Sequence, residues 1–172
     1  MRFQDIPKFT FSGNYAVHVD WRELKHTLDR YTKTYNLDMN PDFQRGHVWN
    51  DDKRTAYVEF ILRGGDSSRE VYFNCKGWMA GGEGPMQLVD GKQRIEAVMQ
   101  FLDNKIPAFG HYFNEYTDRM NNAWFHVHVN NLPTRAQVLQ WYIDLNAGGV
   151  VHTSEEINKV KKLLEEEKEK KP

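Results

Sequence analysis

The chain has 172 residues and a mass of 20.3 kDa, of which 40% are hydrophobic and 13% aromatic. This length suits a domain that buries its own core, and the aromatic content excludes a chain that is disordered as a whole. Lys and Arg total 23 against 24 Asp and Glu, so a net charge of -1 disfavours a polycation that coats nucleic acid. The single cysteine, Cys75, excludes an internal disulfide framework and a cysteine-rich zinc site.

The N-terminal sequence MRFQDIPKF has no apolar signal core, and no apolar run approaches the roughly 18 residues of a membrane span. We therefore expect a cytoplasmic protein with no membrane partner. No repeat or linker divides the chain, so the sequence predicts one domain over residues 1–164 and a charged C-terminal tail over residues 165–172.

The first part of the chain predicts two strand-like segments followed by two helices. Residues 9–13 and 15–19 are rich in strand-forming residues, and Asp20 is the predicted N-cap of a helix that Asn40-Pro41 breaks. A second helix begins after residue 50 and ends at two glycines. Its predicted apolar face consists of Tyr57, Phe60 and Ile61.

The remainder predicts three strands and three more helices. The strands are expected at residues 70–74, 86–89 and 125–129, and the last of them leaves His126 and His128 on a polar outer face. A metal site there needs a third ligand that is not nearby in sequence. The helices are expected from Lys92, after Thr134 and after Thr153. Together these elements predict an α+β fold with a small mixed sheet packed against several helices.

The densest candidate site is Leu-Val-Asp-Gly-Lys-Gln-Arg at residues 88–94. A strand runs into an Asp-Gly turn and then a helix start, where free backbone N–H groups and the positive helix end bind phosphate readily. Lys92 and Arg94 add positive charge, and Asp90 has the chemistry to hold Mg²⁺ or to orient water. For these residues alone, a plain turn followed by a solvated, charged first helical turn is the favoured alternative.

A second candidate segment, residues 43–49, places an Arg, a His and a Gln with two aromatic residues in a loop. Arg45 would meet a phosphate there, and Trp49 would stack on a base. The alternative is a loop that Phe43 and Trp49 anchor, with Arg45 merely exposed.

A third candidate segment, residues 144–156, joins two helices through Asn146 and Gly148-Gly149. Glycines allow the backbone to approach a ligand closely. On these residues alone, a common helix–turn–helix corner is the favoured reading.

The three segments occur in a fixed order over residues 40–164: Phe-Gln-Arg with a following Trp, then Asp-Gly-Lys-Gln-Arg, then Leu-Asn with a Gly and a later Glu. In this combination the chain resembles the N-terminal domain of GmrSD-type modification-dependent restriction systems, a family similar to the ParB/sulfiredoxin-like fold. The matching positions are Gln44, Arg45, Trp49, Asp90, Gly91, Gln93, Arg94, Leu145, Asn146, Gly149 and Glu156.

The resemblance implies a single ParB-like domain that binds NTP with Mg²⁺ and hydrolyses it, or transfers its phosphoryl group, in a bacterial or phage DNA-conflict system. In this reading Arg45 and Arg94 neutralise phosphate charge, Asp90 holds Mg²⁺ or positions the nucleophile, and Gln93 completes the catalytic set. The expected nucleotide- and phosphate-binding residues are Gln44, Arg45, Trp49, Gly91, Lys92, Arg94, Asn146 and Gly149.

Two features depart from the family pattern. Lys92 stands where the family usually has Gln, which changes the local charge. The long family members continue into an HNH-type nuclease domain, for which this sequence leaves no room, so we expect no double-strand cleavage by this chain alone.

Two other functions stay open on the sequence. The first is a DNA-acting module, either a nicking nuclease or the DNA-sensing subunit of a restriction pair, whose binding to DNA would depend steeply on salt. The second is a non-catalytic, phage-encoded imitation of the domain that binds a nuclease or another host-defence protein.

Overall fold

The computed structural model describes residues 2–6, 15–44, 49–147 and 154–169, so the strand-like segment expected at residues 9–13 lies outside the described residues. The elements, in chain order, are β1 (Tyr15–Asp20), α1 (Trp21–Tyr35), α2 (Asp51–Leu62), β2 (Glu70–Asn74), β3 (Gln87–Asp90), α3 (Lys92–Leu102), β4 (Trp124–Asn130), α4 (Arg135–Ala147) and α5 (Ser154–Glu169). Short 3-10 turns at Phe3–Asp5, Trp78–Ala80 and Phe113–Glu115 complete the set.

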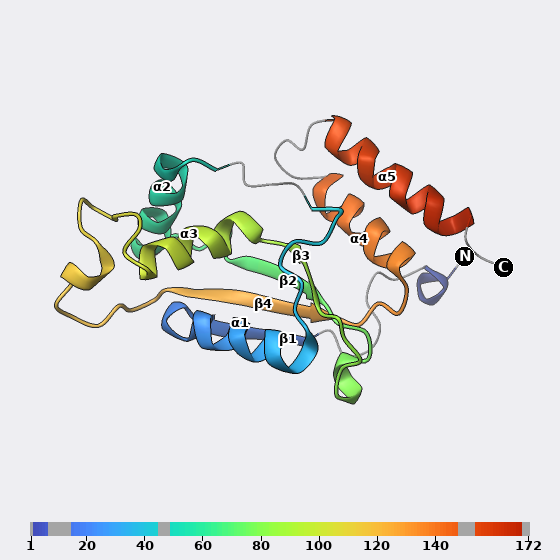
Figure 1. Cartoon of the computed structure of the whole chain (residues 1–172), viewed down its shortest axis with the longest axis horizontal. Helices are drawn as coiled ribbons and strands as arrows, with labels where there is room; N and C mark the ends of the chain where they lie inside the picture. Colours follow the sequence, from blue (N-terminus) through green and yellow to red (C-terminus); the bar gives the residue numbers. More distant parts are fainter. Residues whose placement is uncertain (1, 7–14, 45–48, 148–153, 170–172) are drawn as a thin grey trace.

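The described strands form one mixed sheet in the order β1-β4-β2-β3 (Figure 1). Strand β4 pairs antiparallel with β1 and parallel with β2, and β3 pairs antiparallel with β2 at the other edge. The α+β class, with a small mixed sheet and several packed helices, is therefore confirmed.

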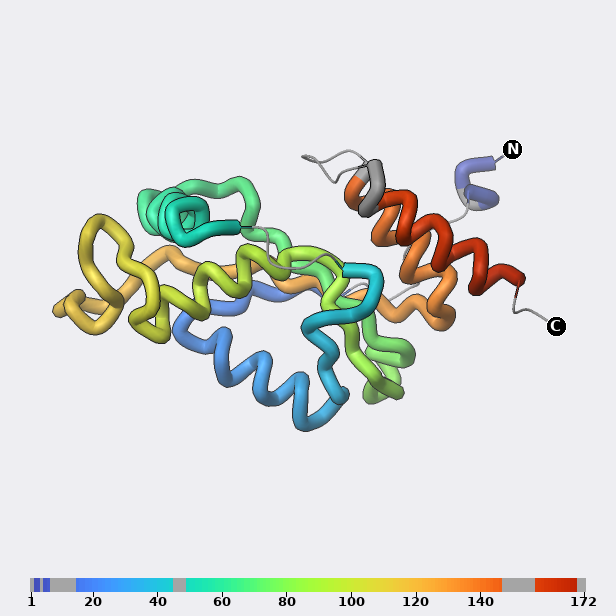
Figure 2. The backbone as a smooth tube through the Cα atoms, turned by 45° about the horizontal axis from the view of Figure 1, so that its top comes forward, coloured from blue at the N-terminus to red at the C-terminus, as the bar shows by residue number. Residues whose placement is uncertain are grey.

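The two faces of the sheet carry different apolar clusters. Helices α1, α2 and α3 pack with the larger cluster, to which Trp21, Phe73 and Phe125 belong. Helices α4 and α5 pack with the smaller cluster, which includes Val89 on the opposite sheet face and Phe43 from the loop after α1. Figures 1 and 2 show α4 and α5 side by side at one end of the molecule, while the long connection from α3 to β4 forms the other end.

Helix α1 begins as predicted and ends earlier than predicted. The Asp20 carboxylate accepts a hydrogen bond from the Arg22 N–H at 2.9 Å, as an N-cap does. The predicted end at Asn40-Pro41 is wrong, because Asn36 adopts a left-handed conformation (φ 49°) and ends the helix there. The chain then pairs along the edge of β3, where the Asp38 N–H donates to the Met86 carbonyl at 2.8 Å. A continued helix would lose this pairing.

Helix α2 is capped by the Asn50 side chain, and it ends before Gly64 as predicted. The predicted burial of Phe60 is wrong, since this side chain is 45% exposed. Its ring lies against Gly65, where any Cβ atom would collide with it. The buried face of the helix consists instead of Tyr57, Val58 and Ile61.

The other predicted elements are found close to their expected positions. Strand β2 and the start of α3 at Lys92 agree with the prediction, and β3 lies one residue later than predicted. Helix α5 continues through Glu169 into the segment predicted as a charged tail. No helix among the described residues is long and apolar enough to cross a membrane.

Candidate functional site

The turn between β3 and α3 depends on Gly91. This residue is the N-cap of α3 and has a φ of 105°, a left-handed value that side chains disfavour. A Cβ atom at this position would lie 2.5 Å from Cγ1 of Val71 on β2. Both the backbone conformation and the packing against the sheet therefore require glycine.

The first turn of α3 presents backbone donors at this turn. Gly91 has no side chain to cap the helix, and its carbonyl accepts the N–H of Ile95 at 2.9 Å. The N–H groups of Lys92, Gln93 and Arg94 precede that first intrahelical donor, so they have no carbonyl within the helix. Together with the helix dipole they make the end of α3 favourable for an anion.

A small cavity of about 70 Å³ lies at this end of α3. The structure brings the predicted Asp-Gly-Lys-Gln-Arg segment together with Gln44 and Trp49, which come from the distant loop before α2. Arg45 and Gly149, also predicted for the site, lie outside the described residues. The residues that line the cavity are Gln44, Trp49, Asp90, Gly91, Lys92, Gln93, Arg94 and Tyr142.

Asp90 and Arg94 form an ion pair in the cavity wall. Nη2 of Arg94 lies 2.5 Å from Oδ2 of Asp90, and the two side chains are 20% and 37% exposed, respectively. Nε of Arg94 is buried and has no hydrogen-bond partner among the described residues. A buried donor without an acceptor is costly, so this nitrogen favours the arrival of an anionic ligand.

The two glutamine side chains hold the cavity wall together. Nε2 of Gln44 donates to the carbonyls of Leu88 at 2.7 Å and Val89 at 2.8 Å, which fixes the loop after α1 against β3. Oε1 of Gln93 accepts the backbone N–H of Trp49 at 3.1 Å, which fixes the start of α2 against α3. The expected contact of these side chains with phosphate or water stays a prediction.

Trp49 lines the cavity with neighbours that the sequence did not indicate. Its ring lies 5.5 Å from the ring of Tyr57, and Nζ of Lys53 lies 5.3 Å from its centre. Lys53 is therefore a further cation close to the cavity wall. Stacking of Trp49 on a base stays a prediction.

Tyr142 is the lining residue that sequence reasoning missed. It comes from α4, and the ring of Phe43 packs edge-on against it at 5.3 Å. Asn146, predicted for the site, is one helical turn further on and donates from Nδ2 to the Tyr142 carbonyl at 2.7 Å. Because residues four apart share a helix face, the position of Asn146 was a usable signal for Tyr142.

The two histidines of β4 are partly exposed on the sheet face that the α4–α5 cluster partly covers, and both contact Glu70 of β2. Nδ1 of His126 is 2.8 Å from Oε1 of Glu70, and Nε2 of His128 contacts Oε2. Burial raises the pKa of Glu70, but the two hydrogen bonds outweigh burial and bring the pKa below its ordinary value. Among the described residues, no group of three or more His, Cys, Asp or Glu side chains has the geometry to hold a metal ion.

A magnesium ion does not require such a group. It is commonly bound through one or two carboxylates together with the phosphates of a substrate, and it keeps several waters. Asp90 offers a partly exposed carboxylate at the mouth of a cavity whose other groups suit phosphate. The residues present therefore fit a magnesium ion that arrives with a nucleotide.

Comparison with protein-family models identifies the family of this chain. Neither the curated proteins nor the solved structures contain a significant match to this chain. The family model of the GmrSD restriction endonuclease, N-terminal domain, matches residues 24–170, a span that includes every residue lining the cavity. The match places the chain in the context of a restriction system. The chain belongs to the family of GmrSD restriction endonuclease N-terminal domains.

Proposed function

We propose that the chain binds a nucleoside triphosphate with Mg²⁺ at the Asp90–Arg94 turn and transfers the terminal phosphoryl group to water. One observation carries this proposal. A carboxylate, two cationic side chains and the N-terminal turn of α3 line a single small cavity. Phosphoryl transfer needs positioning and charge neutralisation rather than a covalent catalyst, and these groups supply both.

The size of the cavity indicates how the nucleotide would enter. About 70 Å³ suits a phosphate group and is far below the several hundred Å³ of cavities that enclose whole ligands. The phosphates would therefore lie against the N–H groups of α3, Lys92 and Nε of Arg94. The base and ribose would remain outside this cavity, on the side of Trp49.

Asp90 and Arg94 would act as a coupled pair. In their present state the carboxylate and the guanidinium neutralise each other across 2.5 Å. An incoming phosphate would share the guanidinium and leave one carboxylate oxygen of Asp90 to the metal or to the attacking water. Bound Mg²⁺ would stabilise the charge that develops on the phosphate oxygens.

The test is phosphate release from ATP, GTP, CTP and UTP in the presence of Mg²⁺. We expect Asp90→Ala and Arg94→Ala each to lower turnover about 100-fold or more, the usual loss when one stabilising group is removed from an active site. The matched control is Asp103→Ala. Asp103 is similarly exposed (33%) and pairs with Lys25 at 3.3 Å, but it lies at the opposite end of α3.

Two outcomes would count against the proposal. Equal turnover in the wild type, Asp90→Ala and Arg94→Ala proteins would mean that the turn has no part in the reaction. A thermal shift with nucleotide but no phosphate release would support binding alone and overturn the hydrolytic step.

A further inference from the structure

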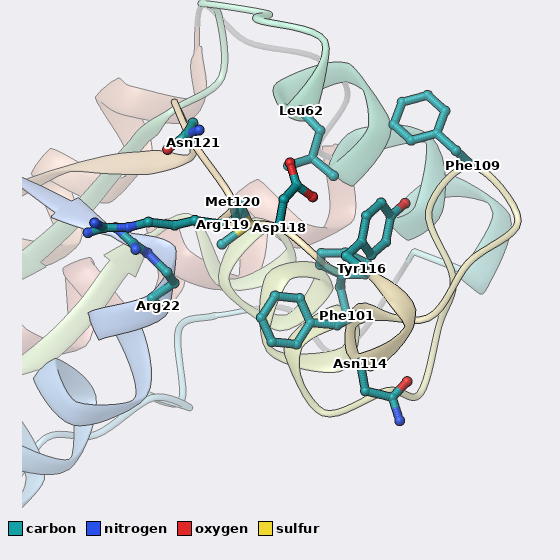
Figure 3. Close-up of a pocket in the computed structure, with 11 residues that line it drawn as sticks. Arg22, Leu62, Phe101, Phe109, Asn114, Tyr116, Asp118, Arg119, Met120 and Asn121 are labelled. Atoms are coloured by element: carbon teal, nitrogen blue, oxygen red, sulfur yellow. The ribbon is translucent and has the colours of Figure 1, made fainter.

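A second and larger cavity lies at the other end of α3 (Figure 3). Its volume is about 590 Å³, which is within the range of cavities that enclose small ligands. It is lined by Phe101 near the end of α3 and largely by side chains of the connection to β4. Helix α3 has 11 residues and so spans about 16 Å, which separates the two cavities.

The connection that builds this cavity is long and well anchored. Between α3 and β4 it contains only the short 3-10 turn Phe113–Glu115, and connections of this length are usually functional. The Phe109 N–H donates to Oε1 of Glu59 on α2 at 2.7 Å, and the Asn114 N–H donates to Oδ1 of Asn104 at 2.8 Å. The hydroxyl of Tyr116 donates to the Ala108 carbonyl at 2.6 Å. These bonds fix the connection that lines the cavity to α2 and to itself.

The cavity offers aromatic rings to a flat ligand. Phe101 is almost fully buried, and the rings of Phe113 and Tyr116 stand edge-on to it at 5.5 Å and 6.1 Å. The thioether of Met120 adds a polarizable group to the same lining. Such walls favour a planar ring over a flexible chain.

Two adjacent charged side chains lie on different sides of these rings. Figure 3 shows the carboxylate of Asp118 directed toward Leu62, whereas the guanidinium of Arg119 extends with that of Arg22 away from the rings. Arg22 forms an ion pair with Asp20 at 2.6 Å, and Arg119 has no hydrogen-bond or ion-pair partner among the described residues. A hydrogen bond from Arg22, with a contribution from the charge of Arg119, lowers the pKa of Asp20. Arg22 and Arg119 therefore share the carboxylate of Asp20, and a positive charge remains on the side of the cavity where the two guanidinium groups lie.

We propose that this cavity binds a nucleotide, with its base against Phe113 and Tyr116, which pack on the buried Phe101, and its phosphate on Arg119. Asp118 would accept a hydrogen bond from an exocyclic amino group of the base. A purely apolar ligand would make no use of Asp118 and Arg119, and a neutral sugar would make no use of the positive charge on the side of Arg119. The site is distinct from the Asp90–Arg94 turn and does not depend on turnover there.

Two sources supply this chemistry: a free mononucleotide, or a nucleotide within single-stranded DNA. Both present a base and a phosphate at a similar separation. Because Asp118 is a hydrogen-bond acceptor, we expect the same preference among bases for a free nucleotide and for a DNA strand. Adenine, cytosine and guanine carry an exocyclic amino group, whereas thymine presents only carbonyl oxygens and a ring N–H to such a carboxylate.

The first experiment is a calorimetric titration with dAMP, dCMP, dGMP and dTMP in the absence of Mg²⁺. We expect dTMP to bind at least about tenfold more weakly than the best of the other three, and Arg119→Ala to weaken that best ligand about tenfold, as expected when a charged hydrogen bond is lost. Asp118→Asn should reduce the discrimination against dTMP. Because both side chains are exposed, these variants should keep the melting temperature of the wild type.

Matched controls separate this site from its surroundings and from the first cavity. Arg63→Ala removes an exposed arginine that lies 5.9 Å from the Phe109 ring but does not line the cavity, and it should leave binding unchanged. Lys92→Ala removes a cation of the first cavity, so nucleotide binding that persists in this variant is assigned to the second cavity. Loss of binding in Lys92→Ala, with binding kept in Arg119→Ala, would overturn the proposal.

The source of the nucleotide is decided with oligonucleotides. A short single-stranded oligonucleotide of dA that binds more tightly than dAMP, and loses that binding in Arg119→Ala, would identify a DNA strand as the ligand. An abasic oligonucleotide should bind much more weakly. Equal binding of the abasic strand, no binding of any nucleotide, or binding of N-acetyltryptophanamide alone would each overturn the proposal, the last in favour of an aromatic side chain of a protein partner.

Discussion

The two ends of α3 carry cavities of opposite character. At the first turn, three separate segments enclose about 70 Å³, and most of their lining side chains are charged or amide. At the last turn, aromatic rings and one long connection enclose about 590 Å³. The first cavity is encoded by a short run of residues around a glycine turn, and the second is encoded by scattered residues without a motif. A motif thus reveals a cavity that is built on a backbone turn, whereas a cavity that is built from scattered side chains stays hidden in the sequence.

The largest expected effect comes from the glycines at the two ends. Gly91→Ala should lower the free energy of unfolding by about 3 kcal/mol, because left-handed strain adds to the collision with Val71. The melting temperature should fall by about 6–12 °C for a chain of this size. Gly110→Ala, in the connection at the other end, has a φ of 78° but no atom within 4 Å of the added Cβ. Gly110→Ala should lower the free energy of unfolding by only about 1 kcal/mol. Equal losses in the two variants would show that close packing is not what distinguishes the Gly91 turn.

A smaller effect is expected from the side chains that hold each cavity wall. Gln44→Ala removes two hydrogen bonds to the carbonyls of the buried residues Leu88 and Val89, and should cost about 2 kcal/mol in urea unfolding. Glu59→Ala removes one exposed bond to the Phe109 N–H and should cost about 0.5 kcal/mol, because water replaces the lost partner. The reverse order would mean that the long connection, and not the Gln44 loop, is the more firmly held wall.

The tyrosines at the two ends should differ in alkaline solution. Burial raises the pKa of Tyr57, which contacts Trp49, well above its ordinary value of 10.0, and burial also raises the pKa of the more exposed Tyr116. A tyrosine whose pKa is raised by folding does not change the free energy of unfolding with pH below about pH 10. Above that pH the unfolded protein loses the phenol proton more readily than the folded protein, so the free energy of unfolding falls.

The melting temperature of the wild type should fall as the pH rises above 10. We expect Tyr57→Phe to reduce this fall more than Tyr116→Phe does. Tyr57→Phe also removes a hydrogen bond to the Ser68 carbonyl, and Tyr116→Phe removes one to the Ala108 carbonyl. The two substitutions should therefore lower the free energy of unfolding by similar amounts near pH 8. Melting temperatures near pH 8 and near pH 10.5 measure the difference. An identical pH dependence in the two variants would contradict the stronger burial of Tyr57.

The smallest effect is expected on the part of the sheet face that carries Glu70, His126 and His128, which line neither cavity. Glu70→Gln weakens the contacts with His126 and His128, and at neutral pH should cost at most about 1 kcal/mol because these side chains are partly exposed. The lowered pKa of Glu70 means that its contribution is present above about pH 4.5 and is lost as the pH falls. The variant should therefore approach the wild type in acid. Neither nucleotide turnover nor nucleotide binding should change, and a change in either would link this face to a cavity.

Local patterns predicted the elements where one physical cause dominates. Alternating apolar residues placed β4, and the Asp-Gly turn placed the start of α3 at Lys92. The errors occur where a distant partner competes with the local pattern. Phe60 fits the apolar stripe of α2 but covers Gly65 at the surface, and α1 ends at Asn36 because the following residues pair with β3.

For the first cavity, the sequence by itself determined the turn from Asp90 to Arg94, because its residues are adjacent and glycine alone satisfies the backbone there. Only the tertiary structure decided that Gln44 and Gln93 bond to the backbone of the cavity wall and that Tyr142 joins them. For the cavity at the other end, the sequence determined little beyond a long connection between α3 and β4. Phe101, Tyr116 and Arg119 line one cavity because the connection folds back on α2 and α3, and such packing depends on residues far apart in the chain.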